Sequence, residues 1–146
     1  MNGNVLAHTM NPRIGYIKIN GTLASEFMIY SYAAAYYHVP TVYLSGDKQL
    51  CETYASLHPK LVTTAVKEGD AFAAVCMSPT QAIATIEKDV TGALEQDLSN
   101  ACITLPDTFE VEIRYKEHYN SSKPSYYPGM KRLDDNTLLF KAKDYM

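Results

Sequence analysis

The chain has 146 residues, of which 47% are hydrophobic and 20% are charged, and its 13 basic and 16 acidic side chains give a net charge of −3. This length fits one domain with a real core, and the scattered basic residues do not support a nucleic-acid partner. No apolar run approaches the ~20 residues of a membrane span, and no secretory signal precedes the first strand, so a cytoplasmic protein without a membrane partner is expected. Three widely spaced cysteines match neither a disulfide framework nor paired zinc ligands and are expected to be buried: Cys51, Cys76 and Cys102.

Residues 1–13 are expected to form a loop, because asparagine, glycine and proline interrupt the periodic pattern that a helix or strand would need. This loop carries His8. The segment 14–20 alternates with the period of a strand and ends in an Asn-Gly pair, whose residues tolerate the positive φ of a tight turn. The turn is expected to lead directly into a helix over 24–37 that is apolar on nearly every face. Glu26 is the only formal charge in that helix, and the N–H dipoles of the first turn favour a carboxylate there.

The middle of the chain alternates short strands with helices. The expected elements are strands over 41–44 and 61–66, a polar turn over 67–70, and helices over 48–57 and 79–100. Asp47 suits the N-cap of the first helix, while Ser78 and Pro79 suit the N-cap and first position of the second. The apolar run 71–77 fits either a strand or a helix.

The C-terminal third is expected to be mainly antiparallel. Strict alternation predicts a half-exposed strand over 109–115, and the segments 131–133 and 137–142 predict a closing hairpin. Residues 117–130, rich in Tyr, Ser, Pro and Asn, are expected to form an irregular loop. The whole pattern predicts a single α/β domain over 1–146, with a layered mixed sheet, packed helices and an antiparallel hairpin near the C-terminus.

No local catalytic motif is complete, since the sequence contains no HExxH, P-loop, GxSxG or CxxC pattern. Taken singly, His8 is most simply an exposed loop residue, Glu26 a partner of the helix dipole and Asp47 a helix cap. Spacing alone therefore indicates an α/β domain without a particular chemistry.

The order of several short motifs nevertheless resembles that of a known family. LAHTM is followed by a strand closing on ING, a glutamate that opens an alanine-rich helix, VPTVYLSGD, VTTAVKEG, a Ser-Pro helix, and FEVEI with a closing hairpin. In this order the motifs resemble the C-terminal half of the zinc D-aminopeptidases of the dipeptide-transport type, family 55 of the metallopeptidases. The resemblance covers nearly the whole chain and implies the C-terminal part of a larger two-domain metallopeptidase.

The resemblance implies a hydrolase that releases an N-terminal D-residue such as D-Ala from short peptides, assembles as a homo-oligomer and holds two zinc ions. It places the role of nucleophile or general base on His8 and the role of zinc ligand on Glu26. A carboxylate at the start of a rigid helix can be held to the zinc–oxygen distance of ~2.0–2.2 Å. Thr9, Asn20 and Asp47 are weaker candidates for supporting the ligands or contacting substrate.

The sequence also departs from the family. The family's Asp-x-Glu zinc motif and two ligand histidines lie in its N-terminal half, to which no segment here corresponds, and His38, His58 and His118 match no family ligand. Phe72 and its neighbours occupy a shortened stretch where the family tends to carry an arginine. Tight zinc binding by this chain alone is therefore not expected.

Three hypotheses follow. In the preferred one, the chain is the C-terminal part of a zinc D-aminopeptidase and needs an N-terminal half, supplied by a separate chain or absent from this sequence. In the second, it is a catalytically inactive oligomerisation or binding module derived from that family. In the third, it is an unrelated α/β domain that binds a small ligand. The first predicts that His8 and Glu26 converge on one open pocket. It also predicts that the apolar helix exposes a face at Phe27, Tyr30 or Ala34, or buries that face in a homomeric contact.

Overall fold

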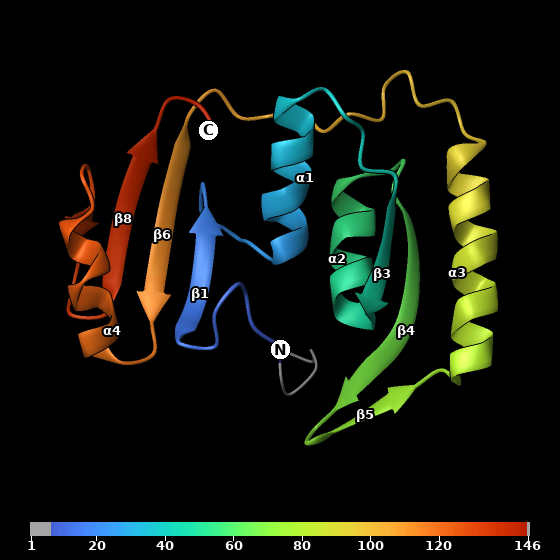
Figure 1. Cartoon of the computed structure of the whole chain (residues 1–146), viewed down its shortest axis with the longest axis horizontal. Helices are drawn as coiled ribbons and strands as arrows, with labels where there is room; N and C mark the ends of the chain where they lie inside the picture. Colours follow the sequence, from blue (N-terminus) through green and yellow to red (C-terminus); the bar gives the residue numbers. More distant parts are fainter. Residues whose placement is uncertain (1–6, 146) are drawn as a thin grey trace. The chain divides into compact units, whose positions relative to one another are not determined.

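The computed structural model describes residues 7–145, which form two compact units. The mixed unit contains Ala7 and His38–Ile103, and the antiparallel unit contains His8–Tyr37 and residues 104–145 (Figure 1). Each unit has its own sheet with helices packed on it, which confirms the mixed α/β class. Whether the two units make up the single expected domain stays a prediction.

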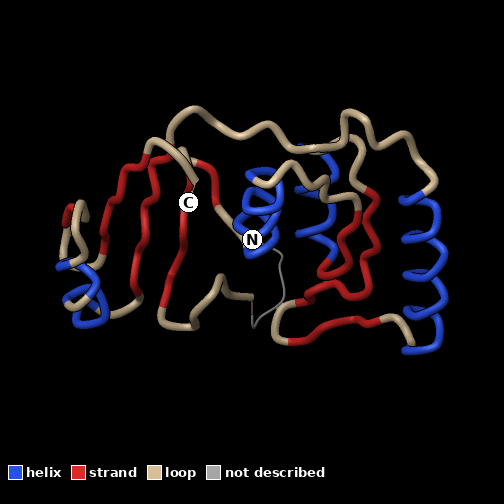
Figure 2. The backbone as a smooth tube through the Cα atoms, turned by 45° about the horizontal axis from the view of Figure 1, so that its top comes forward, coloured by secondary structure: helices blue, strands red, loops and turns tan. Residues whose placement is uncertain are grey.

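The antiparallel unit holds a five-stranded sheet in the order β2-β1-β6-β8-β7, in which every neighbouring pair is antiparallel. Figure 2 shows the strands of both units in red. Its elements are β1 (Ile14–Ile19), β2 (Thr22–Leu23), α1 (Glu26–Tyr36), β6 (Phe109–Tyr115), α4 (His118–Ser122), the 3₁₀ helix η1 (Pro124–Tyr126), β7 (Lys131–Arg132) and β8 (Thr137–Ala142). The expected strands over 14–20 and 109–115 and the closing hairpin are confirmed. The core of the sheet comes from Ile17, Ile19, Phe109 and Leu138, all buried.

The turn after β1 is the expected one, but it does not start the helix. Asn20 and Gly21 have φ of 49° and 80°. Positive φ at both positions matches the twist of a two-residue hairpin, so the chain first turns back as β2, which pairs Thr22 with Ile19. The helix α1 begins only at Glu26, and the expectation that the turn leads directly into it was wrong.

The helix α1 buries one side and exposes another. Met28, Ser31 and Ala35 are buried, whereas Tyr30 is 62% exposed. The expected exposed apolar face is therefore confirmed at Tyr30. The ring of Tyr145, which packs edge-on against Phe109, fastens the C-terminal segment to this helix through a hydrogen bond from its hydroxyl to the Ile29 carbonyl.

The mixed unit holds a three-stranded sheet in the order β3-β4-β5, in which β3 and β4 are parallel and β4 and β5 are antiparallel. Its elements are β3 (Tyr43–Asp47), α2 (Lys48–Leu57), β4 (Val62–Asp70), β5 (Ala73–Cys76) and α3 (Pro79–Leu94). Both helices contact β3 and β4. The helix α2 and its Asp47 cap are confirmed, since Asp47 Oδ1 accepts the Gln49 N–H at 3.0 Å.

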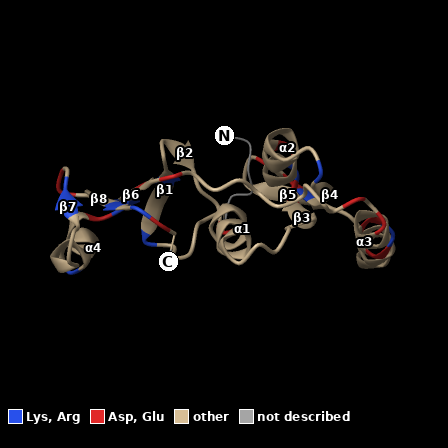
Figure 3. Cartoon of the chain, turned by 90° about the horizontal axis from the view of Figure 1, so that it is seen from above, with Lys and Arg blue, Asp and Glu red and all other residues tan. Residues whose placement is uncertain are grey.

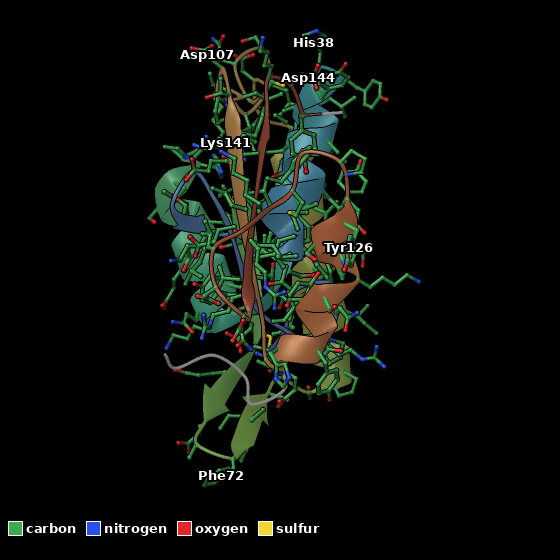
Figure 4. The ribbon with its side chains drawn as sticks, turned by 90° about the vertical axis from the view of Figure 1, so that its left-hand side faces the viewer. His38, Phe72, Asp107, Tyr126, Lys141 and Asp144 are labelled. Carbon is green, nitrogen blue, oxygen red and sulfur yellow. The ribbon has the colours of Figure 1, made fainter. Side chains whose placement is uncertain are left out.

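The β4–β5 hairpin corrects two sequence expectations. Residues 67–70, expected as a polar turn, form the second half of β4, because they pair with the four residues of β5. The turn lies instead at Ala71, whose φ is 50°, and Phe72, which is 93% exposed at the tip of the hairpin (Figure 4). Within the ambiguous run 71–77, residues 73–76 therefore form the strand β5, and residues 71 and 72 form the turn.

The helix α3 starts as predicted but ends early. Ser78 caps it by accepting the Gln81 N–H, and Pro79 is its first residue. It ends at Leu94 rather than at residue 100, because the Asp97 side chain accepts the Ser99 N–H at 3.0 Å and offers the backbone a local turn in place of the helix.

Residues 117–130, expected as an irregular loop, contain the helical turns α4 and η1. Ser121 is fully buried, and its hydroxyl bridges the carbonyls of His118 and Asp135 at 2.7 and 2.6 Å. This contact over 14 residues, which local composition does not reveal, fastens α4 to the β7–β8 turn.

The three cysteines differ in exposure. Cys51 is buried as expected, but Cys76 and Cys102 are exposed, so the expectation of three buried cysteines was wrong; Cys76 lies in β5, whose four residues are all exposed. Basic and acidic residues occur in both units (Figure 3). Within residues 7–145, no helix combines the length and apolar character that a membrane span requires.

Candidate functional site

Two hydrogen bonds fasten the segment that follows His8 to the start of α1. Thr9 Oγ1 donates to the Ala24 carbonyl at 3.0 Å, and the Met10 N–H donates to Glu26 Oε1 at 2.9 Å. All of these residues belong to the antiparallel unit. The structure therefore brings the chain around His8 and the carboxylate of Glu26 together, although they are 18 positions apart in the sequence.

Glu26 is placed by the local sequence around the helix start. Ser25 is the N-cap, with extended backbone and a side chain that accepts the Met28 N–H at 3.3 Å, so Glu26 is the first helical residue. A carboxylate at this position is favoured by the helix dipole. Glu26 is exposed, and one of its carboxylate oxygens accepts a hydrogen bond from the Met10 N–H. The other oxygen can therefore reach a cation.

His8 and Thr9 differ in how far they are exposed. His8 is exposed, whereas Thr9 is half-buried with its hydroxyl committed to the Ala24 carbonyl. Thr9 thus holds the loop against the start of the helix. In this way it also positions His8, the residue that precedes it in the sequence.

Asn20, another residue of the predicted site, forms its side-chain hydrogen bonds elsewhere in the same unit. Its Oδ1 accepts the Glu110 N–H at 2.7 Å, and its Nδ2 donates to the Thr108 carbonyl at 2.8 Å. Both ends of the amide therefore hold the β1–β2 turn against the start of β6. A role in contacting substrate stays a prediction.

Asp47 belongs to the mixed unit and is only half satisfied. Its Oδ1 caps α2, whereas its Oδ2 is buried without a hydrogen-bond partner among residues 7–145. A buried acceptor without a donor costs on the order of 1–3 kcal/mol. The carboxylate therefore lacks a donor at the carboxyl end of β3.

The other histidines belong to different segments of the chain. His38 is exposed at the end of α1 with φ of 59°, and His118 begins α4. His58 follows α2 and stacks on Tyr54 with ring centroids 6.3 Å apart, and burial lowers its pKa from the ordinary 6.5. Their positions agree with the lack of any match to a family ligand.

The donor set does not fit a complete zinc site. Zinc in proteins takes three or four side-chain ligands, and residues 7–145 contain no group of three His, Cys, Asp or Glu side chains that could hold a metal ion. Glu26 fits as a single ligand.

Sequence reasoning missed the two groups that shape this site. The Met10 contact uses a backbone N–H, and since nearly every residue has this group, the residue type gives no signal of the contact. Ser25 could have been found, because serine directly before an apolar helix is an N-cap signal.

Comparison with known proteins agrees with this picture. A family model described as D-aminopeptidase matches residues 1–146. A D-aminopeptidase of Bacillus subtilis (strain 168) is 27% identical over 144 residues, which is 97% of this chain and 53% of the relative. The solved structure of the Zn-dependent D-aminopeptidase DppA from Bacillus subtilis, described as a self-compartmentalizing protease, matches with a TM-score of 0.88 at 25% identity and covers 99% of this chain and 53% of that one. The chain thus spans about half the length of the relatives it matches.

Proposed function

The chain belongs to the D-aminopeptidase family, and from this we propose that it is the part of a zinc-dependent D-aminopeptidase that contributes His8 and Glu26 to the active site. The observation that carries the proposal is the pair of hydrogen bonds that hold the His8–Met10 segment on the first turn of α1. Since the chain spans only 53% of its relatives, the remaining ligands would come from the other half, on a separate polypeptide or on sequence outside this chain.

In this proposal Glu26 is one ligand of a two-zinc site. The Met10 N–H holds one carboxylate oxygen and fixes the side chain, which leaves the second oxygen for the metal. The Ser25 cap and the buried side of α1 keep the helix start rigid. When bound, zinc polarises a peptide carbonyl and lowers the pKa of bound water.

His8 is proposed to take the proton or to attack directly, a role for which imidazole is the side chain used most often. The Thr9 hydroxyl, bonded to the Ala24 carbonyl, holds the loop that carries it. A catalytic group must stay within reach of the reacting atoms, and this short tether limits how far His8 can move from the helix start.

The proposed substrates are short peptides with an N-terminal D-residue such as D-Ala, hydrolysed in the cytoplasm. A homo-oligomer is also proposed, because a relative that covers 99% of this chain is described as self-compartmentalizing. The exposed Tyr30 and Phe72 would be available for such contacts.

A second candidate is a catalytically inactive oligomerisation or binding module of the same family. The observation that favours it is the lack of any three-ligand group among residues 7–145. It would show the same assembly with neither zinc nor hydrolysis.

The test is complementation. The chain would be co-expressed with the half of the B. subtilis relative that it does not match, and zinc content and hydrolysis of D-Ala-D-Ala would be measured. We expect neither property in the chain alone, and both in the complex. Glu26→Gln should lower zinc content, whereas His8→Ala should keep zinc and abolish hydrolysis.

Matched controls are Glu87→Gln on the exposed side of α3 and His38→Ala after α1, and both should behave like the unaltered chain. Full hydrolysis in the Glu26→Gln complex would contradict the assignment of Glu26. An assembled complex with no zinc and no hydrolysis would favour the inactive module.

A further inference from the structure

The sheet of the mixed unit has an open edge. The strand β3 lies at the end of the order β3-β4-β5, and no strand among residues 7–145 pairs with its other side. It pairs with β4 in parallel, and parallel strands are usually found inside larger sheets that are covered on both faces. A parallel strand at the edge of a three-stranded sheet therefore indicates a sheet that continues.

The peptide groups that face this edge can be assigned from the register. The Val62 N–H donates to the Val42 carbonyl at 3.0 Å, so Val42 faces β4. Successive residues of a strand face opposite edges, which places Leu44 on the paired side and Tyr43 and Ser45 on the open side.

Nothing in the sequence of β3 protects the edge. Edge strands are usually kept short, or carry lysine or proline, or are twisted away by a bulge. The five residues of β3, YLSGD, include neither lysine nor proline, and the register shift falls only between Gly46 and Asp47 at the last pair. The edge strands of the antiparallel unit, β2 and β7, have two residues each.

A second, independent observation points to the same edge. Asp47 ends β3, and its buried Oδ2 has no donor among residues 7–145. A segment laid along β3 would end near this oxygen and could supply the missing donor.

We propose that a strand from the half of the D-aminopeptidase that this chain does not match pairs with the open edge of β3 and supplies a hydrogen-bond donor to Asp47 Oδ2. The occupant is chosen because the relative matches 99% of this chain yet has about as much sequence again. The inference rests on the proposed function for the identity of that half. It adds the place where the half docks, through main-chain hydrogen bonds to Tyr43 and Ser45.

The first test is amide exchange by NMR on the unaltered chain, alone and in complex with the unmatched half of the B. subtilis relative. We expect the Tyr43 and Ser45 amides to exchange rapidly in the chain alone and at least tenfold more slowly in the complex. The Leu44 amide faces β4 and should be protected in both samples, which makes it the internal control.

The second test uses a pair of proline variants. Proline lacks the N–H and is tolerated where that group faces away from the sheet. The Met77 N–H donates to the Val66 carbonyl at 2.9 Å, so alternation places Ala74 on the outer edge of β5, as Ser45 is on that of β3. Ser45→Pro should weaken the complex at least tenfold, and Ala74→Pro should leave it unchanged.

The outcomes separate this inference from the proposed function. A complex with slow exchange at Tyr43 and Ser45 but without zinc or hydrolysis would support the docking edge and overturn the activity. An active complex in which those two amides still exchange rapidly would overturn the docking edge alone. If the Tyr43 and Ser45 amides became protected in the chain alone as its concentration is raised, the edge would be assigned to a second copy of the chain and the inference would be overturned. The absence of any complex would also overturn it.

Discussion

The two units differ in how far each completes its own structure. In the antiparallel unit, the two-residue strands β2 and β7 end the sheet on both sides, and Leu138 at its centre is fully buried. In the mixed unit, the sheet ends on one side in a five-residue strand and on the other in β5, all of whose residues are exposed. The helix α3 buries only Ala93, and its Ile83 and Leu94 are 67% and 62% exposed.

This difference shows which parts of the proposed site can exist without a partner. Glu26, the Met10 N–H that holds it and the loop that carries His8 all lie in the antiparallel unit, whose core is closed. The open edge and the unpaired Asp47 Oδ2 lie in the mixed unit. In the proposed function, the antiparallel unit would therefore preform one side of the active site, whereas the docking of the other half would depend on the mixed unit.

The largest expected effect is the loss of the antiparallel core. Leu138 is fully buried in β8, where it is paired with Ile113, so Leu138→Ala should lower the free energy of unfolding of this unit by about 2–5 kcal/mol through the cavity it leaves. Amide exchange in β1 and β6 would report the loss.

Leu133→Ala is the matched control, since Leu133 is 52% exposed and its truncation should change stability by less than about 0.5 kcal/mol. If Leu138→Ala removed protection from β3 and β4 to the same extent as from β1, the two units would unfold together and the comparison would fail.

An intermediate effect is expected from a buried hydrogen bond in the mixed unit. Thr64 is 2% exposed, and its hydroxyl donates to Asp89 Oδ2 and accepts from the Tyr43 hydroxyl, both at 2.7 Å. Thr64→Val keeps the shape but leaves both partners without it, which should lower the free energy of unfolding by about 1–3 kcal/mol. Exchange of the β4 amides would measure the change.

Thr63→Val, one residue earlier in β4 and half-buried, serves as the control and should be nearly neutral. Equal effects of the two variants would mean that the Tyr43–Thr64–Asp89 network does not stabilise this unit.

Much of the fold could be predicted because its signals are local. The Asn-Gly turn, the alternation of FEVEIRY and the caps of α2 and α3 depend on neighbouring residues, and each was found in the structure. The errors arose where the structure of a segment depends on residues outside it. Residues 67–70 are a strand because β5 pairs with them, and α4 is held by the contact between Ser121 and Asp135.

The candidate site was harder to predict from the sequence than the fold. Glu26 and His8 are ordinary residues when taken singly, and only the order of motifs along the chain connected them to a chemistry. The contact between the loop that follows His8 and Glu26 depends on a backbone N–H that reaches across 16 positions, from Met10 to Glu26. The division into two units was not predicted either, because the antiparallel unit joins segments from both ends of the chain, and no sequence pattern marks that pairing.

The smallest expected effect depends on pH and separates the units again. His58 stacks on the buried Tyr54 in the mixed unit, and burial lowers its pKa below the 6.5 that it has when unfolded. In the antiparallel unit, the Tyr16 hydroxyl donates to Glu112 at 2.7 Å and lowers the pKa of that carboxyl from 4.5. Each group binds a proton more readily in the unfolded state, so each contributes stability that is complete above its unfolded pKa and is lost as pH falls.

The mixed unit should therefore begin to lose stability below pH 6.5, whereas the antiparallel unit should begin only below pH 4.5. Amide exchange at pH 7.5 and 5.5, corrected for intrinsic rates, would measure the two units in one sample. His58→Gln should remove the slope between these pH values in the mixed unit, and Glu112→Gln should leave it unchanged. A slope that persists in His58→Gln, or that appears equally in β1 and β6, would show that another group controls this window and that the units respond to acid as one.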